Sequence, residues 1–326
     1  MEATDPNEDP SSDYDESVGT AEFTSITASR LRYSFQHGRR YQGFLQDRYG
    51  FPNDDTEQMR EGFKHKLYVD YILGGRLICA PVGHHPQKIV DLGTGVGYWA
   101  QDVADHYPSA RVIGSDISPI QPHWTPPNVE FHVEDLEDEH RPWTNIYEDA
   151  DLIHIRAFLQ TVRNPRRIIE RSFENLKPGG WIESHEAIPE VSSSDGTAGH
   201  DHPLNKLCRL LDGPFARIYG WDMQTSRRIP ELLKDAGFIN INVRHNRVPL
   251  GRWHPEARMR EMGMFCQIVC EGAVAALLGR PDTMGLSEEE AACLTEEFYV
   301  SVNDPSIHAH MDWVDVWAQK PDSRDA

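Results

Sequence analysis

A glycine-rich turn between a short apolar run and a helical pattern constrains this chain more than any other feature. Residues 89–100 read IVDLGTGVGYWA, so glycines at 93, 95 and 97 follow the apolar run that carries Asp91. Glycines at a strand-to-helix turn let the main chain approach a ligand that lies over the carboxyl edge of an open α/β sheet. The segment therefore predicts a strand, a loop that binds a nucleoside-type cofactor, and a helix, in that order.

The spacing of these glycines disfavours a dinucleotide. The dinucleotide fingerprint is G-x-G-x-x-G, and Tyr98 stands where its third glycine would fall. Asp91 also brings a negative charge close to the loop, which suits a ligand with an ammonium group better than a pyrophosphate. A nicotinamide oxidoreductase is kept only as an alternative interpretation.

Short apolar runs alternate with helical patterns in the middle of the chain. Strands are predicted at 88–92, 111–115, 129–133, 151–155 and 180–184, with helices at 98–106 and 166–176. Such alternation gives parallel strands joined by right-handed crossovers, with helices on both faces of the sheet. Two later strands, 238–247 and 308–318, break this rhythm and predict an antiparallel edge. Further helices are predicted at 204–219, 228–236, 255–278 and 287–300.

Polar residues end the second and third predicted strands at the same edge of the sheet. Asp116 comes 21 residues after Gly95, where a carboxylate can accept hydrogen bonds from both hydroxyls of a ribose. Asp135 and Leu136 follow the third strand, where an acid can accept from an adenine amine while an apolar side chain covers the ring. These positions predict an adenosine moiety in the cofactor.

The run from Asp91 to Glu183 resembles the core of the class I S-adenosylmethionine-dependent methyltransferases. A narrower resemblance, to the fungal LaeA-like (TAM-type) methyltransferases, rests on HGRRY at 37–41, YGFPND at 49–54, SPIQP at 118–122, PPNV at 126–129, KPGGWIE at 177–183, AGF at 236–238 and VPLGRW at 248–253. The resemblance implies S-adenosyl-L-methionine as cofactor and an α/β fold: a Rossmann-like class I methyltransferase sheet, mostly parallel with an antiparallel edge strand. It also implies an N-terminal helical cap and a helical insert before the last strand.

The resemblance further assigns a set of cofactor-binding residues, which are Asp91, Gly93, Thr94, Gly95, Gly97, Asp116, Ile117, Asp135, Leu136, Arg156 and Tyr41. The glycines would line the methionine part of the cofactor, with Asp91 near its amino group. Asp116 would bind the ribose, and Asp135 with Leu136 would hold the adenine. Arg156 and Tyr41 would face the cofactor from the substrate side.

Catalysis by such an enzyme requires no metal ion, because the methyl group of a sulfonium is already electrophilic and the rate depends on holding the acceptor near it. A hydroxyl or amine acceptor must lose a proton, and a histidine is the usual base. His154 on the fourth strand is our first candidate, although the same residue could simply pack beside a helix. Glu186 and Tyr41 are the other catalytic candidates. A carboxylate acceptor would need no base.

Composition divides the chain into segments. Residues 1–22 contain eight acids and no Lys or Arg, so we expect a disordered acidic tail. A helical N-terminal cap is expected at 23–80. A methyltransferase domain is expected at 81–320, with its helical insert at about 251–300, and a short tail at 321–326.

The net charge and the start of the chain limit which partners and which cellular location we expect. With 32 Lys and Arg against 52 Asp and Glu, the net charge of −20 makes nucleic acid an unfavourable partner. The start of the chain has neither a basic region nor an apolar core, and we see no apolar run of the roughly 18 residues needed to span a membrane. We therefore expect a cytoplasmic protein, with a nuclear location as the alternative. Cys266 and Cys270, at i and i+4, are expected to be small buried apolar residues rather than metal ligands.

Two functions fit these features. The first is an enzyme that methylates oxygen, nitrogen or sulfur of a small molecule, a fungal secondary metabolite. The second is a LaeA-like regulator that acts through a protein partner, with weak or protein-directed methyl transfer. The sequence leaves the acceptor molecule, the acceptor atom and the oligomeric state open.

Overall fold

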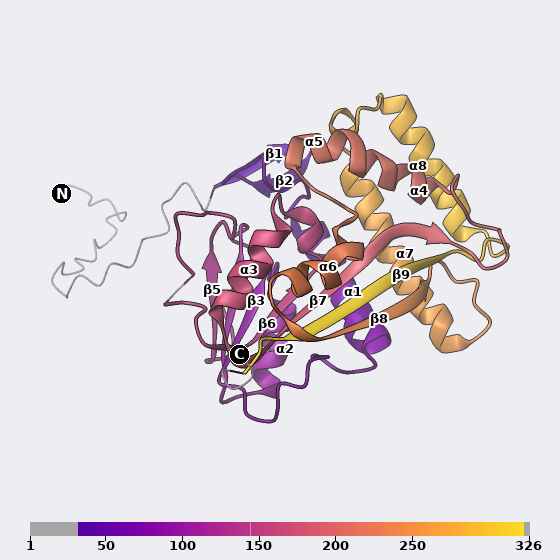
Figure 1. Ribbon diagram of the computed structural model, residues 1–326. Helices are drawn as coiled ribbons and strands as arrows, with labels where there is room; N and C mark the ends of the chain where they lie inside the picture. The colour runs from indigo at the N-terminus through magenta and orange to yellow at the C-terminus, as the bar shows by residue number, and fades with distance from the viewer. Residues whose placement is uncertain (1–31, 144, 323–326) are drawn as a thin grey trace, which may run out of the picture.

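The computed structural model describes residues 32–143 and 145–322, so the predicted acidic tail at 1–22 lies outside the described residues. A seven-stranded sheet forms its centre, in the order β5-β4-β3-β6-β7-β9-β8 (Figure 1). Its strands are β3 (Lys88–Leu92), β4 (Arg111–Asp116), β5 (Val129–Val133), β6 (Ala150–Arg156), β7 (Leu176–Ser192), β8 (Ile239–Pro249) and β9 (His310–Gln319). Strands β3 to β7 pair in parallel, whereas β9 pairs antiparallel with β7 and β8. The predicted Rossmann-like sheet with an antiparallel edge is confirmed.

Strand β3 lies between β4 and β6, so the chain leaves β3 on one side and later returns on the other. The connecting helices are α2 (Tyr98–His106), with the predicted bounds, and α3 (Pro165–Asn175). A reversal of strand order opens a crevice at the carboxyl ends of the strands, which is where open α/β sheets bind ligands. The fold therefore puts the glycine-rich loop at this crevice.

The N-terminal segment differs from the helical cap expected at 23–80. Its first described elements are two strands, β1 (Tyr33–Gln36) and β2 (Arg39–Gln42), which form an antiparallel hairpin. His37 and Gly38 between them have φ of 49° and 73°, the left-handed pair that closes a tight two-residue hairpin turn. The helical expectation was wrong here because it followed composition and overlooked the turn.

Helix begins further along this segment. Helix α1 (Asp55–Lys66) starts after Asp54, whose side chain accepts from the N–H of Glu57, and it continues into the π-helical turn η1 (Leu67–Ile72). Residues 48–64, which include most of α1, face the loops at the carboxyl ends of the central strands. We call residues 33–66, from the hairpin to the end of α1, the roof of the crevice.

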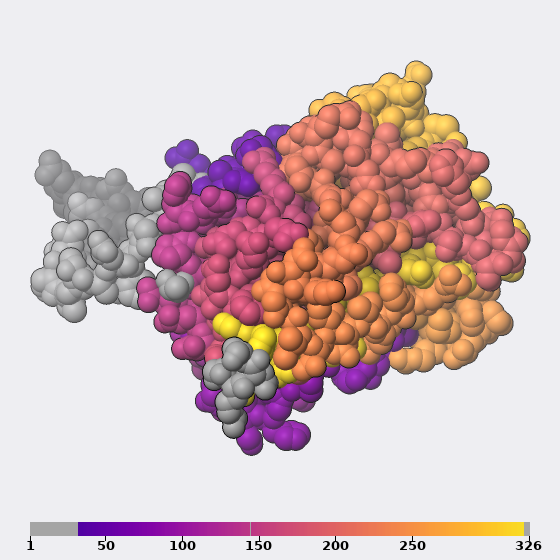
Figure 2. Space-filling model, in the orientation of Figure 1, coloured from indigo at the N-terminus to yellow at the C-terminus, as the bar shows by residue number. Residues whose placement is uncertain are grey.

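Apart from η2, which lies between β6 and α3, the remaining helices come after β7 in the chain. They are η2 (Leu159–Thr161), α4 (Pro203–Leu210), η3 (Leu211–Phe215), α5 (Ala216–Tyr219), α6 (Thr225–Asp235), α7 (Ala257–Leu278), η4 (Pro281–Met284) and α8 (Glu288–Asn303). The helix predicted at 204–219 is broken in the middle, because Gly213 takes non-helical angles and Pro214 follows it. Helices α7 and α8 form the expected insert before the last strand. In the space-filling view these C-terminal helices cover the end of the sheet opposite β5 (Figure 2).

Helix α7 is long and apolar enough to cross a membrane by length and composition, which the sequence prediction of no such run had missed. Most of this helix, 61% of its most apolar stretch, is buried inside the fold. Cys266 and Cys270 on it are buried, as expected. The apolarity of α7 is accounted for by packing against α1, α8 and β8.

Candidate active site

A cavity lies at the carboxyl ends of β3, β4 and β6, beneath the N-terminal roof. Seven of the predicted cofactor residues line it, and these are Gly93, Gly95, Asp116, Ile117, Asp135, Leu136 and Arg156. We call it the cofactor cavity. The polar residues predicted to end the second and third strands, Asp116 and Asp135, thus do lie together at one edge of the sheet.

The three glycines of the loop have different roles. Gly95, with φ of 57°, faces open space, and a side chain there would project into the cavity. A Cβ atom on Gly93 would come within 2.7 Å of the Phe158 ring, and one on Gly97 within 2.4 Å of the Phe131 ring. Gly97 is not among the residues that line the cavity, and its expected contact with the cofactor stays a prediction. This glycine instead lets the loop pack closely against β5.

Asp116 stands at the cavity wall with its carboxylate held by main-chain groups. Its two oxygens accept from the N–H of Gly95 and the N–H of Ser118, both at 2.8 Å. Burial raises the pKa of Asp116 to about 6, and these two hydrogen bonds only partly oppose that rise. A carboxylate fixed in this way is ready to accept further hydrogen bonds, as the hydroxyls of a ribose would supply.

Asp91 and Thr94 lie behind the loop rather than in the cavity. The Thr94 hydroxyl donates to Asp91 Oδ2 at 2.6 Å, and Asp91 Oδ1 lies 2.7 Å from His154 Nδ1. Both oxygens of the carboxylate are therefore engaged within the protein. The expected position of Asp91 beside the amino group of the cofactor, and the expected cofactor contact of Thr94, stay predictions.

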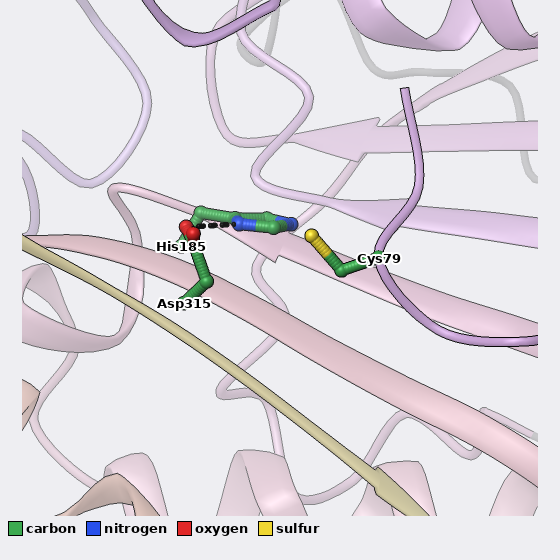
Figure 3. A group of neighbouring side chains, drawn as sticks. All are labelled: Cys79, His185 and Asp315. Atoms are coloured by element: carbon green, nitrogen blue, oxygen red, sulfur yellow. Dashed lines mark hydrogen bonds and ion pairs between the residues drawn. The ribbon is translucent and has the colours of Figure 1, made fainter. Parts of the chain in front are cut away.

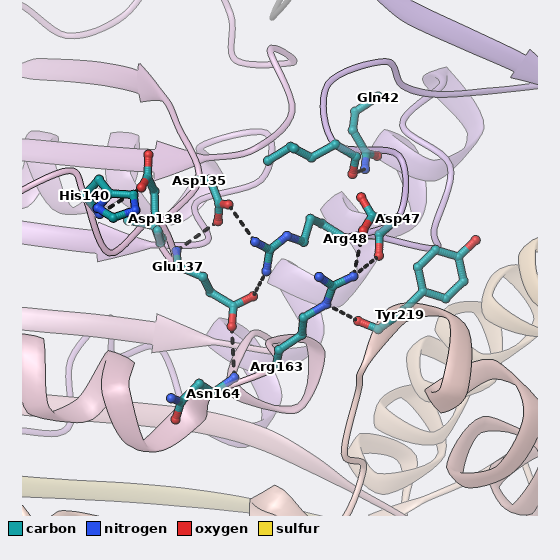
Figure 4. A network of polar contacts seen from close by, with 12 residues as sticks. Gln42, Asp47, Arg48, Asp135, Glu137, Asp138, His140, Arg163, Asn164 and Tyr219 are labelled. Atoms are coloured by element: carbon teal, nitrogen blue, oxygen red, sulfur yellow. Dashed lines mark hydrogen bonds and ion pairs between the residues drawn. The ribbon is translucent and has the colours of Figure 1, made fainter.

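The end of β5 is joined to the roof by charged side chains (Figure 4). Arg48 lies between two carboxylates, 3.4 Å from Asp135 and 3.3 Å from Glu137. Arg163 binds both the carbonyl and the carboxylate of Asp47 at 2.9 Å. These contacts hold the roof across the adenine end of the cavity.

None of the three candidate bases lines the cofactor cavity. His154 is fully buried, its ring stacks on Trp99 with centroids 3.6 Å apart, and burial lowers its pKa. Glu186 accepts from the N–H groups of Phe158 and Leu159, and burial raises its pKa to about 7. Arg156, two residues further along β6 on the same face, does line the cavity, so His154 lies deeper along the strand and its assignment as a base stays a prediction.

Tyr41, the third candidate and also a predicted cofactor residue, is buried in β2. Its hydroxyl has no hydrogen-bond partner among the described residues, and the Arg280 guanidinium lies 4.8 Å from its ring centroid. Burial raises the pKa of Tyr41. Tyr41 thus packs against Arg280 of the helical insert and is not among the residues that line the cofactor cavity, so its place at the cofactor stays a prediction.

Sequence reasoning missed the contribution of α1 to the cavity. Glu61 and Lys64 line it from above, with Lys64 Nζ 2.6 Å from a Glu61 oxygen. Burial lowers the pKa of Lys64, while Lys64 and Arg60 hold the pKa of Glu61 at about 2 against the effect of burial. The signal in the sequence was the i, i+3 spacing of these charges on a helix that is otherwise packed against α7.

A second cavity adjoins the first. The two share Tyr49, Lys64, Ala157 and Thr161 as walls. The remaining walls of the second cavity are mostly apolar and come from the roof, η3, α4, α7 and β9, among them Phe51, Leu207, Leu211, Trp221, Val269 and Trp313. We call it the acceptor cavity.

Comparison with known proteins identifies the class. Residues 63–243 match the model of a family described as a methyltransferase domain, which is more than half of the 326 residues. The chain belongs to this family and is a class I S-adenosylmethionine-dependent methyltransferase. The nicotinamide alternative is thereby set aside.

The relatives narrow the class further. The chain is 35% identical to methyltransferase pytC of Aspergillus terreus, over 96% of this chain and 94% of that protein. It is 34% identical to secondary metabolism regulator LAE1 of Cochliobolus heterostrophus, over 79% of this chain and 84% of the regulator. The LaeA-like resemblance is confirmed. Among solved structures, phosphoethanolamine N-methyltransferase 2 of Haemonchus contortus is similar at 17% identity with a TM-score of 0.46, covering 86% of this chain and 62% of that one.

The residues present fit S-adenosyl-L-methionine. Gly95 leaves open space where a side chain would stand, Asp116 presents a carboxylate from β4, and Asp135 with Leu136 closes the far end. A loop, an acid and an acid–apolar pair in this order match the methionine, ribose and adenine parts of that molecule.

Proposed function

We propose that this enzyme methylates an oxygen, nitrogen or sulfur atom of a small, largely apolar molecule, in the class of fungal secondary metabolites. The observation that carries the proposal is the acceptor cavity, an apolar space that adjoins the cofactor cavity. Small-molecule sites are concave, mostly apolar and supplied with a few polar groups. The similarity to pytC over nearly the whole chain supports the same interpretation.

The chain's own residues define where an acceptor would stand. When bound, S-adenosyl-L-methionine supplies an electrophilic methyl group, so the protein's task is to orient an acceptor and keep water out. Tyr49, Ala157 and Thr161 form the boundary between the two cavities, and Phe51 packs over Trp221 with ring centroids 5.9 Å apart behind it. This aromatic wall excludes water from the acceptor side.

Lys64 is our candidate for the group that takes the acceptor's proton. Its side chain lines both cavities, and burial lowers its pKa, which eases loss of its own proton. Once Lys64 has taken a proton, its ammonium group donates to the Glu61 carboxylate, which holds the side chain in place between turnovers. Lys64 thus replaces His154 in the mechanism that we propose.

A pair of matched variants on α7 tests the acceptor cavity. Ala273 lines this cavity, whereas Ala275 is exposed on the same helix. Ala273→Phe should lower turnover of apolar hydroxyl, amine or thiol acceptors by about tenfold and leave the affinity for S-adenosylhomocysteine unchanged. Ala275→Phe should change neither. Equal turnover by the two variants would contradict the placement of the acceptor.

A second function is favoured by the regulators among the relatives. One of these, at 32% identity over 78% of this chain, is named protein-methionine methyltransferase laeA of Emericella nidulans. The two functions separate when the pure enzyme is incubated with labelled S-adenosylmethionine and either a metabolite panel or a cell extract of proteins. Label in protein alone, with no metabolite turned over, would favour the regulator and overturn our proposal.

A further inference from the structure

A buried polar cluster lies beside the acceptor cavity on the sheet, because its residues His185 and Asp315 stand two positions from Ala187 and Trp313 in the cavity wall, and the proposed methyl transfer makes no use of it. Asp91, His154 and Glu183 are direct neighbours across β3, β6 and β7. Two residues along β7, His185 is the neighbour of Asp315 on β9. Because strand residues two apart share a face, all five side chains point the same way. All are almost completely buried.

Two atoms in this cluster lack partners although water cannot reach them. His185 Nε2 and Glu183 Oε1 are buried without a hydrogen bond among the described residues. They lie 3.5 Å from one another. Two ligand atoms of a tetrahedral zinc ion, each about 2.0 to 2.1 Å from the metal, are roughly 3.3 Å apart. The separation of these two atoms is therefore close to that of two ligands of one ion.

His154 belongs to the same group. A nitrogen of His154, an oxygen of Glu183 and a nitrogen of His185 all lie within 4.8 Å of one another. Two histidines and a glutamate are a set of donors typical of zinc. The cluster thus offers three ligands of suitable chemistry at suitable distances.

Each histidine is oriented by a carboxylate, as metal-binding histidines are. Asp91 lies 2.7 Å from Nδ1 of His154, and Asp315 lies 2.8 Å from Nδ1 of His185. Asp315 is held in turn by Arg244 and Asn246, at 2.9 Å and 2.7 Å. A carboxylate on one ring nitrogen fixes the tautomer so that the other nitrogen is free to bind a metal.

Cys79 completes the group from the segment that precedes β3. In Figure 3 the second ring nitrogen of His185 points toward the Cys79 sulfur, and these two residues with Asp315 form a second close group. The main-chain N–H groups of Cys79 and Ala80 donate to Glu183 Oε2, which leaves Oε1 directed at the cluster. A thiol thus lies beside His185, and it also accepts from the Arg244 guanidinium at 3.2 Å.

The charges of the cluster favour a divalent cation. Asp91, Glu183 and Asp315 supply three carboxylates, against the single guanidinium of Arg244. With neutral histidines two negative charges remain in a buried place, where uncompensated charge is costly. One divalent ion would neutralise them.

We propose that His154, Glu183 and His185 bind one zinc-class divalent ion, with Cys79 in the fourth position. The site is structural, since all four positions are filled by protein, and it ties the segment at residues 79–80 to β7 behind the cofactor loop. It does not rest on the proposed function.

Metal content of the full-length chain tests this site. Protein purified without chelators should carry about one zinc ion per chain. After treatment with a chelator, its unfolding temperature should fall, and added Zn²⁺ should restore it. His185→Gln should lose both the ion and the response. The matched control is His200→Gln, because His200 is an exposed histidine beside Asp201 and should leave both unchanged.

Cobalt binding is a second test, and it remains informative if His185→Gln fails to fold, because it uses the metal-free wild-type chain and a different variant. Co²⁺ added to the metal-free chain should show the visible absorption of a tetrahedral ion together with a thiolate-to-cobalt band in the near ultraviolet. Cys79 is only partly buried, so Cys79→Ser should fold, bind Co²⁺ and lose only the ultraviolet band.

Three outcomes would count against the site. A chain that holds no zinc as purified and binds neither Zn²⁺ nor Co²⁺ overturns it, and the cluster then carries a proton on His185 between Asp315 and Glu183. Metal bound equally by folded His185→Gln also overturns it. Bound cobalt without any thiolate band overturns the assignment of Cys79 and leaves the other three ligands standing.

Discussion

The guanidinium of Arg48 lies 3.4 Å from the Asp135 carboxylate, which ties the N-terminal roof to the loop after β5. A second carboxylate, that of Glu137, lies 3.3 Å from the same side chain. Because Asp135 lines the cofactor cavity, this contact bridges the cavity between the roof and the loop after β5. The roof is thus held by ion pairs at the point where cofactor would enter and leave.

Arg48→Gln should speed release of cofactor. The Arg48 side chain is partly exposed, and ion pairs of that kind are worth about 0.2 to 1 kcal/mol, so we expect the dissociation rate to rise by about two- to five-fold. Stopped-flow displacement of S-adenosylhomocysteine measures it. Arg166→Gln, which removes an exposed pair with Asp235 outside the cavity, is the control. Identical rates for the two variants would show that Arg48 does not hold the roof.

Asp116 should make cofactor affinity depend on pH. Its pKa of about 6 means that the carboxyl becomes protonated, and loses its capacity to accept from two hydroxyls, as the pH falls through 6. The dissociation constant should therefore rise between pH 7.5 and 5 in calorimetric titrations. Asp116→Asn should bind more weakly by about 1.5 to 3 kcal/mol at pH 7.5 and lose this pH dependence. A variant that keeps the wild-type profile would move the ribose elsewhere.

Gly95→Leu should abolish cofactor binding, because its side chain would occupy the cavity. The positive φ also adds strain of roughly 1 to 2 kcal/mol, which a control must share. Gly196→Leu provides it, since Gly196 has φ of 81° and open space around it in a surface turn. Both variants should lose similar stability in thermal unfolding, and only Gly95→Leu should lose binding. Retained affinity would disprove the assignment of the loop.

Lys64→Met should lower kcat by about 10²- to 10⁴-fold for a hydroxyl or amine acceptor, the usual contribution of a general base. Its cofactor affinity should change little. Lys66→Met on the same helix is the matched control, because Lys66 is exposed and pairs with Asp70. The dependence of kcat on pH distinguishes a base from a structural residue. In the wild type kcat should rise towards alkaline pH as Lys64 loses its proton, and this rise should be absent in Lys64→Met alone. A kcat within twofold of wild type would exclude Lys64 as the base.

The order of the elements could be predicted because it is written in local patterns. The glycine turn and the acids at 116 and 135 each mark the end of a strand, and the structure has strands ending at or just before them, whereas the proline–glycine run at 178–180 lies inside β7, which begins directly after α3. The hairpin at β1 and β2 could not be predicted from apolar periodicity, since β1 is mostly exposed and the two buried residues of β2, Tyr41 and Gln42, are adjacent rather than alternating.

The site residues show where such reasoning stops. Asp91 and His154 were assigned by position along a strand, but how deep a side chain lies below the sheet edge depends on the pairing of the strands, and Gly93 and Arg156, two residues further on, are the ones that line the cavity. Lys64 reaches the cavity from a helix that lies far from the sheet in sequence, so only the packing of α1 over the strands reveals it. Long-range contacts of this kind leave no local signal.

The length of β7 has a consequence for how acceptors can diversify. Its first half pairs with β6 beside the cofactor cavity, and Ala187 and Pro189 in its second half line the acceptor cavity while β9 supports it on the other edge. One strand thus fixes the distance between the cofactor cavity and the acceptor cavity. Substitutions in α4 and α7 can change the shape of the acceptor cavity for other molecules while β7 keeps the distance to the cofactor cavity unchanged.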